Sequence, residues 1–340
     1  MRAVRLTGAG IVLADAPRPE AGDGQALVEV TAAGLCHSDL TLAARPLAEL
    51  SFPLPFTLGH ELAGRVVALG AGVHGLEVGD AVVGYGPRGC GACRACVSGA
   101  INLCRRPRPT HPPGLGVDGA LASHVAVDTT ALVPAAGIEP QHAAVLTDAG
   151  LTTWHAARRA LPDRRGTVVV LGIGGLGHLA VQILGLWRDV RVIAVDTSAE
   201  KRALASALGA VAAAPADVVE AVADLTGGEG ADAVLDLVAS PSTFAVLPAL
   251  VAVGGTISIV GVGTARLPVG MHALPLGTRV DLPFWGTRTD LLDVLDLARR
   301  GLLTPDVECI ALEDAVEGYA RLERGDVRGR LVAVPGGVGR

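Results

Sequence analysis

The fold of this chain is most constrained by a glycine cluster that lies between two apolar runs in residues 167–196. The run Thr167-Val-Val-Val-Leu171 is short and rich in β-branched residues, which is typical of a strand buried on both faces. Gly172-Ile-Gly-Gly-Leu-Gly177 follows at once and opens a helical pattern of apolar residues. A second apolar run, 192–195, ends in Asp196, 19 residues after Gly177. This order predicts a strand, a tight turn, a helix and a second strand.

Each part of the cluster has a physical role in holding a dinucleotide. Gly172 permits a tight turn, Gly174 lets backbone N–H groups approach a pyrophosphate at a helix N-terminus, and Gly177 lets the helix lie close to its strand. The Asp196 carboxylate can accept hydrogen bonds from an adenosine ribose and would repel a 2′-phosphate. We therefore expect a Rossmann-type fold that binds NAD through these residues: Gly172, Gly174, Gly175, Leu176, Gly177 and Asp196.

The bulk composition excludes several classes of protein. The chain has 340 residues, of which 50% are hydrophobic and 18% charged, so we expect a globular protein of two domains. A net charge of −6 gives no electrostatic reason to bind nucleic acid or an anionic membrane. The sequence lacks an uninterrupted apolar stretch of about 18 residues, so we expect no membrane span. Closely spaced cysteines indicate metal binding in a reducing, cytoplasmic environment.

The order of the expected elements predicts an α/β chain in which one domain interrupts the other. Short strands separated by glycine turns fill the first 85 residues and indicate a small β-barrel-like domain. Alternating strands and helices follow and indicate a doubly wound parallel sheet, and a strand at 330–334 closes the chain. We expect a β-rich domain at 1–149 and 287–340, with an irregular lobe at 86–119, and a dinucleotide-binding domain at 150–286.

Four cysteines within this lobe have the spacing of a metal site, Cys90-x2-Cys93-x2-Cys96-x7-Cys104. Four thiolates this close on a glycine-rich loop can surround one tetrahedral zinc ion and leave no open position, so such a site is structural. An iron–sulfur centre is the competing metal interpretation. Unligated cysteines are a weaker explanation, because the rest of the chain holds only two of its six cysteines.

A second set of possible ligands is scattered along the chain: Cys36, His60 and Asp148. A thiolate, an imidazole and a carboxylate suit a zinc ion with three protein ligands and one position open to water or substrate. The residues alone leave other roles open. Cys36 could be a small buried apolar group, His60 a core histidine, and Asp148 a helix cap.

The order of these motifs resembles that of the zinc-dependent medium-chain alcohol dehydrogenases, essentially from end to end. The motifs are Gly-x-Cys-His-Ser-Asp at 34–39, Gly-His-Glu at 59–61, the four-cysteine lobe and the glycine cluster. The likeness is greatest to bacterial NAD-dependent secondary-alcohol dehydrogenases. It implies a GroES-like catalytic domain, a Rossmann domain, NAD, a structural zinc and a catalytic zinc bound by Cys36, His60 and Asp148. The family ligand set of two cysteines and one histidine has a cysteine at the third position. Asp148 stands there in this chain, and its oxygen would change the Lewis acidity of the zinc.

The resemblance implies roles for several further residues. Glu61 corresponds to a glutamate behind the zinc, and Asp39 to the carboxylate that orients the His60 ring. Ser38 corresponds to the hydroxyl that takes the substrate proton. His37 and Arg328 correspond to residues that contact the cofactor pyrophosphate. Some relatives complete the proton relay with a histidine where this chain has Thr41, so we expect the proton to leave by another route.

The resemblance also places four apolar side chains in the substrate cleft: Phe52, Leu115, Phe284 and Trp285. Core packing is the alternative for each of them. A cleft without fixed charge favours neutral alcohols and ketones, including bulky or aryl ones, over sugars and hydroxy acids. We therefore expect a secondary-alcohol dehydrogenase.

Other functions remain open on the same fold. The alternatives are a primary-alcohol or aldehyde dehydrogenase, a zinc-free quinone or enone reductase, and a non-catalytic NAD-binding relative. The four-cysteine lobe argues against the reductase. By analogy with the family we expect a homo-oligomer, a tetramer or a dimer, that pairs through residues 256–263.

Overall fold

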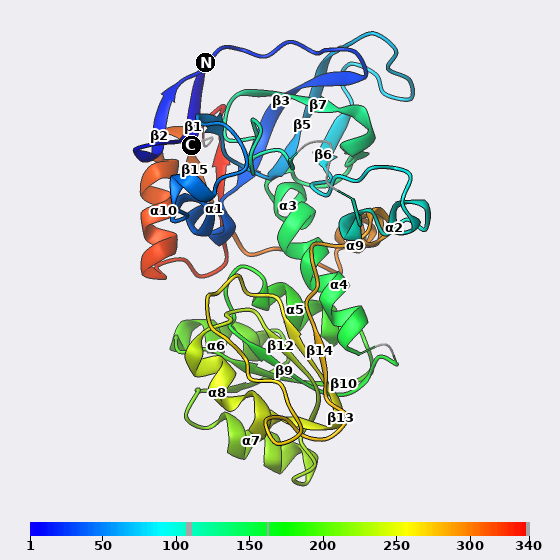
Figure 1. The fold of residues 1–340 in the computed structure, drawn as a ribbon, viewed down its shortest axis with the longest axis vertical. Helices are drawn as coiled ribbons and strands as arrows, with labels where there is room; N and C mark the ends of the chain where they lie inside the picture. Colours follow the sequence, from blue (N-terminus) through cyan, green and yellow to red (C-terminus); the bar gives the residue numbers. More distant parts are fainter. Residues whose placement is uncertain (107–110, 162, 338–340) are drawn as a thin grey trace. The chain divides into compact units, whose positions relative to one another are not determined.

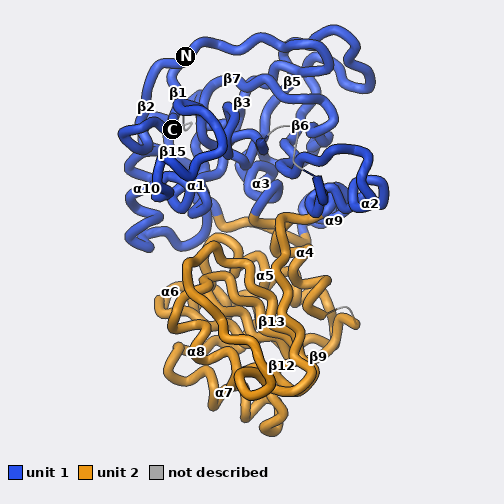
Figure 2. Tube along the Cα trace, viewed as in Figure 1, with its two compact units in different colours: residues 1–148, 287–301, 307–340 blue, residues 149–286, 302–306 orange. Residues whose placement is uncertain are grey.

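The computed structural model describes residues 1–106, 111–161 and 163–337, which fold into two compact units (Figures 1 and 2). Unit 1 contains Met1–Asp148, Thr287–Gly301 and Val307–Arg340, and unit 2 contains Ala149–Gly286 and Leu302–Asp306. The predicted fold class, an α/β chain with a β-rich part and a parallel-sheet part, is confirmed. Residues 107–110 of the predicted 86–119 lobe lie outside the described residues.

Unit 2 is built on a six-stranded sheet with the order β11-β10-β9-β12-β13-β14. Every pair of neighbours in it is parallel. This is the strand order 3-2-1-4-5-6 of a dinucleotide-binding fold, in which ligands bind at the carboxyl ends of the strands where the order reverses. The strands are β9 (Arg165–Leu171), β10 (Asp189–Val195), β11 (Val211–Ala213), β12 (Ala231–Asp236), β13 (Val251–Ile259) and β14 (Arg279–Asp281).

Helices of unit 2 connect these strands and cover the sheet (Figure 1). The β-branched runs predicted as buried strands form its centre: Val169, Ile193 and Val234 are fully buried in one apolar cluster. The helices are α4 (Leu151–Ala160), α5 (Gly177–Gly185), α6 (Ala199–Ala207), α7 (Val218–Thr226) and α8 (Pro241–Leu250).

The glycine cluster forms the turn from β9 into α5. Gly172 has φ +91°, a backbone conformation that side-chain-bearing residues rarely adopt. α5 begins at Gly177, where a Cβ atom would overlap the backbone carbonyl of Gly172. The tight turn and the close approach of helix to strand therefore both require glycine.

Unit 1 contains two sheets. A seven-stranded sheet has the order β15-β16-β3-β5-β6-β8, with β7 paired to β3, and a three-stranded sheet has the order β2-β1-β4. The strands are β1 (Arg2–Thr7), β2 (Gly10–Asp15), β3 (Gln25–Gly34), β4 (Phe56–Thr57), β5 (Glu61–Leu69), β6 (Ala81–Gly84), β7 (His124–Asp128), β8 (Leu132–Pro134), β15 (Val307–Ala311) and β16 (Arg330–Val334).

The helices of unit 1 are α1 (His37–Ala43), α2 (Arg94–Val97), α3 (Pro140–Val145), α9 (Arg288–Arg299) and α10 (Ala315–Arg324). Short 3-10 turns occur at Leu47–Glu49, Ile101–Leu103, Thr129–Ala131 and Leu312–Asp314. The core packs strands of both sheets against α10, whose Ala315, Tyr319 and Leu322 are buried. None of the described helices is long and apolar enough to cross a membrane.

The structure differs from the sequence expectations in local ways. Residues 140–160 do not form one continuous α-helix, because a π-helical turn, Leu146–Gly150, separates α3 from α4. The short segment Leu302–Asp306 was assigned to the β-rich domain but belongs to unit 2. Side chains of α5 hold it there: Gln182 exchanges two hydrogen bonds with the backbone of Thr304, and His178 accepts one from the Asp306 N–H.

Candidate metal and cofactor sites

Four potential ligands from distant parts of the sequence converge in unit 1: Cys36, His60, Glu61 and Asp148. Their ligand atoms all lie within 4.8 Å of one another. Asp148 Oδ2 lies 3.6 Å from Cys36 Sγ and 3.6 Å from His60 Nε2. Asp148 sits in the π-helical turn, a feature that is frequent at functional sites. The structure therefore brings together the three residues predicted to bind a catalytic zinc.

Cys36 is fixed by the start of α1, for which it is the N-cap residue. The Ser38 N–H donates to Cys36 Sγ at 3.5 Å, and the Cys36 N–H donates to Asp39 Oδ2 at 3.2 Å. This reciprocal capping box satisfies backbone donors at the helix start. These contacts hold the sulfur at the start of α1.

His60 is oriented by Asp39, which is completely buried. His60 Nδ1 lies 3.2 Å from Asp39 Oδ1, so the partners assign the proton to Nδ1 and leave Nε2 facing Asp148. Burial opposes a charged ring, but the Asp39 carboxylate and hydrogen bonds to Asp148 raise the pKa of His60 well above its ordinary value. The site therefore attracts a cation, which a proton or a metal ion supplies.

Glu61 is buried beside this cluster and forms an ion pair with the buried guanidinium of Arg330 in β16. Burial raises the pKa of the Glu61 carboxyl, and the charge of Arg330 opposes that rise. Gly34 leaves the space that the carboxylate fills, since a Cβ there would overlap Glu61 Oε2. Arg330 was not singled out in the sequence analysis, and the apolar run that follows it in β16 gave no signal of a buried ion pair.

The donor set fits a zinc ion. Thiolate, imidazole and carboxylate are all zinc ligands. Glu61 Oε2 is buried without a hydrogen-bond partner among the described residues, which an additional cation would satisfy. Cys36, His60 and Asp148 would hold the ion, with Glu61 close behind.

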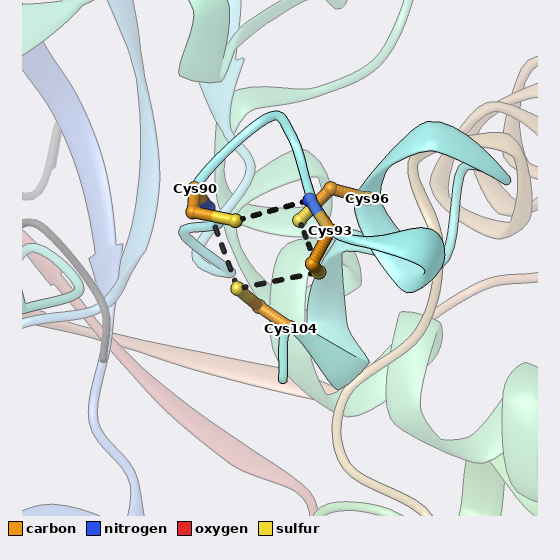
Figure 3. Close-up of side chains that lie close together, drawn as sticks. All are labelled: Cys90, Cys93, Cys96 and Cys104. Carbon is orange, nitrogen blue, oxygen red and sulfur yellow. Dashed lines mark hydrogen bonds between the residues drawn. The ribbon is translucent and has the colours of Figure 1, made fainter. Parts of the chain in front are cut away.

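The second metal-ligand group consists of the four cysteines of the lobe, whose sulfurs point toward one another (Figure 3). Cys93 Sγ lies 3.5 Å from Cys96 Sγ and 3.9 Å from Cys104 Sγ. Zinc bound to four sulfurs at about 2.3 Å places those sulfurs about 3.8 Å apart, so the spacing fits. Backbone N–H donors to Cys93 and Cys104 Sγ stabilise thiolates. All six cysteines of the chain are free thiols.

The predicted cofactor loop lies at the carboxyl end of β9 in unit 2. Gly174 has open space where a Cβ would lie, so the backbone is accessible there. Asp196 Oδ2 accepts a hydrogen bond from the Ile173 N–H at 2.7 Å, and Oδ1 accepts one from the Ser198 N–H at 2.8 Å. Asp196 therefore also holds the glycine loop in place. Gly175 and Leu176 complete the turn before α5.

His178 is a buried residue of this loop region that the sequence analysis missed. Its Nδ1 donates to the Gly174 carbonyl at 2.9 Å, and its Nε2 accepts from the Asp306 N–H at 3.0 Å. These partners assign a neutral ring with the proton on Nδ1. Its place directly after Gly177 was the only available signal.

The remaining predicted polar residues lie near the first cluster or on the surface of unit 1. Ser38 is half-buried, with its Oγ 3.5 Å from Cys36 Sγ. His37 is exposed in the first turn of α1, and Thr41 is half-buried one turn later. Arg328 is exposed between α10 and β16.

The predicted substrate-pocket residues fall into two groups. In unit 1, Phe52 and Leu115 are half-buried against the same apolar core, and the Phe52 ring packs edge-on against His111 with centroids 5.1 Å apart. In unit 2, the rings of Phe284 and Trp285 are 5.2 Å apart, with Phe284 40% exposed and Trp285 only 5% exposed. Trp285 has φ +48°, which is unusual for a bulky residue.

Comparisons with known proteins agree with the fold. Residues 22–137 match the alcohol dehydrogenase GroES-like domain, and residues 175–299 match the zinc-binding dehydrogenase family. An NAD-dependent alcohol dehydrogenase of Sulfurisphaera tokodaii is 36% identical over 98% of this chain and 100% of its own length. The chain therefore belongs to the zinc-binding alcohol dehydrogenases.

Solved structures are similar over nearly the full length of the chain. The alcohol dehydrogenase of Aeropyrum pernix superposes with a TM-score of 0.90 at 31% identity, covering 98% of this chain and 100% of that one. An acetophenone reductase of Geotrichum candidum in complex with NAD superposes with a TM-score of 0.87 at 32% identity, covering 98% and 96%. The predicted family is thereby confirmed.

Proposed function

We propose that the protein catalyses the reversible oxidation of neutral secondary alcohols to ketones with NAD. The observation that carries the proposal is the convergence of Cys36, His60 and Asp148 in one unit of a chain whose other unit has a dinucleotide-binding fold. Thiolate, imidazole and carboxylate together hold zinc and leave a position for substrate.

The residues of unit 1 handle the proton in this reaction. Zinc supplies a Lewis acid that lowers the pKa of the substrate hydroxyl, and NAD supplies the hydride acceptor. The Ser38 hydroxyl on α1 lies 3.5 Å from Cys36 Sγ, and we assign it the role of accepting the substrate proton during oxidation and returning it during ketone reduction. Asp39 keeps the proton of His60 on Nδ1, so that Nε2 stays available to the ion. Thr41 lacks a ring nitrogen to extend the relay, so we assign the next step of proton exit to water.

The residues of unit 2 hold the cofactor. Backbone N–H groups of 172–177 would bind the pyrophosphate at the N-terminus of α5, and Asp196 would bind the adenosine ribose. His37 and Arg328 are the cationic candidates for further pyrophosphate contacts. The negative charge of Asp196 disfavours a 2′-phosphate, so we expect NAD rather than NADP.

Secondary and aryl substrates are favoured by the residues proposed for the pocket. Phe52, Leu115 and Phe284 offer apolar surface, and the buried Trp285 packs against the Phe284 ring. Such surface binds hydrocarbon groups and leaves additional hydroxyls unpaired. One of the similar structures is an acetophenone reductase, an enzyme named for an aryl ketone.

The test is NADH formation with a panel of alcohols, before and after a chelator removes metal. The panel should contain a short secondary alcohol, 1-phenylethanol, the matching primary alcohols and an aldose. The proposal expects the highest kcat/KM for the secondary alcohols and loss of activity with the metal. Full activity in metal-free protein, or a preference for the aldose, would contradict it.

We further propose that copies of this chain associate through unit 2. Seven large apolar side chains in the stretch from Val253 to Leu282 are exposed: Val253, Val262, Val269, Met271, Leu276, Val280 and Leu282. β14 is an edge strand of the six-stranded sheet, and edges with exposed apolar residues favour pairing with another chain.

A further inference from the structure

We infer that Tyr319 is a positioning residue of the catalytic metal centre, acting through Asp39 on the His60 ligand. The inference rests on the proposed metal site, although not on which alcohol is oxidised. Tyr319 lies on α10, far along the sequence from the predicted ligands, and none of the motifs that define the site includes it.

The contact between Tyr319 and the site is direct and buried. The Tyr319 hydroxyl donates to Asp39 Oδ2 at 2.8 Å across a sequence separation of 280 residues. Tyr319 is 2% exposed and Asp39 is 0% exposed, so water cannot replace this hydrogen bond without rearrangement. Such a donor contributes more inside a protein than on its surface.

The two oxygens of Asp39 contact different partners. Oδ1 faces His60 Nδ1, while Oδ2 accepts from the Tyr319 hydroxyl and, at a longer 3.2 Å, from the Cys36 N–H. The Asp39 carboxylate thus contacts both Cys36 and His60, and its hydrogen bond from the Tyr319 hydroxyl is the shortest of the three. Removing the phenol leaves Oδ2 of this buried carboxylate with only the longer hydrogen bond from the Cys36 N–H, which favours rotation of the Asp39 side chain.

Tyr319 is a permanent donor. Burial and the nearby Asp39 charge raise the pKa of the phenol well above its ordinary value, so the hydroxyl keeps its proton. Asp39 therefore cannot lose this hydrogen bond by titration of the tyrosine in the neutral range. The chain Tyr319–Asp39–His60 consequently holds the ring in the tautomer that presents Nε2 to the ion.

The test compares metal release from wild-type protein and Tyr319→Phe, which removes one oxygen and keeps the ring in the core. Both zinc ions are followed with a colorimetric chelator, and the four-cysteine site serves as the internal reference. Loss of such an outer partner weakens metal binding about 10-fold or more. We expect about 10-fold weaker binding at the Cys36 site, unchanged binding at the four-cysteine site, and a shifted d–d spectrum in the cobalt-substituted protein.

Two variants separate positioning from general destabilisation. Tyr85→Phe removes the only other phenol hydroxyl of the chain and should leave release from the Cys36 site unchanged. Asp39→Asn breaks the same chain of hydrogen bonds, so Tyr319→Phe should add less than about twofold in that background. Equal weakening of both metal sites, full additivity with Asp39→Asn, or wild-type binding and an unchanged cobalt spectrum would overturn the inference.

A second measurement applies if Tyr319→Phe does not fold. The chain has only two tyrosines, so incorporation of 3-fluorotyrosine gives two ¹⁹F resonances. The resonance of residue 319 should move when metal enters the Cys36 site, and that of residue 85 should not. An unmoved resonance at 319 contradicts the inference. Failure of the dehydrogenase proposal can be told apart from failure of this inference. In that case wild-type protein binds two metal ions but forms no NADH.

Discussion

At the scale of single residues, the site is defined by buried charges that neutralise one another. Glu61 and Arg330 are both buried, and each is the principal charged partner of the other. Pairs of this kind add little net stability as a pair, but either partner left alone in the interior is costly.

We predict that Arg330→Met lowers the free energy of unfolding by about 3 kcal/mol or more, because it leaves Glu61 buried without a cation. The double variant Glu61→Gln/Arg330→Met should recover most of the loss. Thermal denaturation of the three proteins checks this, and a double variant no more stable than Arg330→Met would contradict it.

The same variant has a predicted pH dependence. Burial raises the folded-state pKa of Glu61, and Arg330 lowers it, so Arg330→Met raises it further. A carboxyl with a raised pKa contributes stability that is present below its unfolded value and is lost as pH rises through the folded value. The defect of Arg330→Met should therefore be larger at about pH 8 than at about pH 6. A defect that grows on acidification would contradict this.

Replacement of Asp196 tests whether this residue sets the preference for NAD over NADP. Its carboxylate also supports the loop through Ile173 and Ser198. We predict that Asp196→Ala raises the KM for NAD about 10-fold or more, because the substitution removes a hydrogen-bond acceptor for the ribose. The preference for NAD over NADP should also become smaller, because the charge that repels a 2′-phosphate is lost. Steady-state kinetics with each cofactor provide the measurement, and an unchanged cofactor ratio would refute the role.

At the scale of elements, the four-cysteine lobe holds thiols of unequal acidity. Backbone hydrogen bonds, first from Arg105 and then from Cys96, lower the pKa of Cys93 to about 6, while burial raises that of Cys96 to about 11. We predict that iodoacetamide alkylates Cys93 before Cys96 in zinc-stripped protein near neutral pH, because the thiolate is the nucleophile. Mass spectrometry of the alkylated peptides at successive times measures the order of modification. Equal rates would show that the lobe loses this geometry without metal.

The elements also show what the sequence could predict. The buried strands, the glycine turn and the four-cysteine lobe each depend on contiguous residues, and the predicted fold class was confirmed. The sequence spacing of Cys36, His60 and Asp148 left their roles open, and the family resemblance favoured a shared ion. Tyr319, Arg330 and His178 were missed because their partners are fixed by helix packing and strand register between distant segments. Those contacts form only when the chain has folded, and local sequence patterns do not predict them.

At the scale of the whole molecule, the exposed apolar stretch of unit 2 predicts self-association. We expect light scattering to give a mass above the 34.3 kDa of one chain. Substituting the exposed Val253 and Leu282 with lysine should shift the mass downward, because a buried charge at an interface is costly. Lysine at the exposed Val97, in the other unit, is the matched control. A wild-type protein that is monomeric at micromolar concentration would contradict the prediction.

The central claim is that one zinc ion is held jointly by Cys36, His60 and Asp148. The most direct measurement is an anomalous-difference map of crystals grown from zinc-loaded protein, with data recorded on both sides of the zinc absorption edge. We predict two peaks per chain, one among the four lobe cysteines and one bonded to Cys36 Sγ, His60 Nε2 and an Asp148 carboxylate oxygen. A single peak, in the lobe alone, would contradict the account.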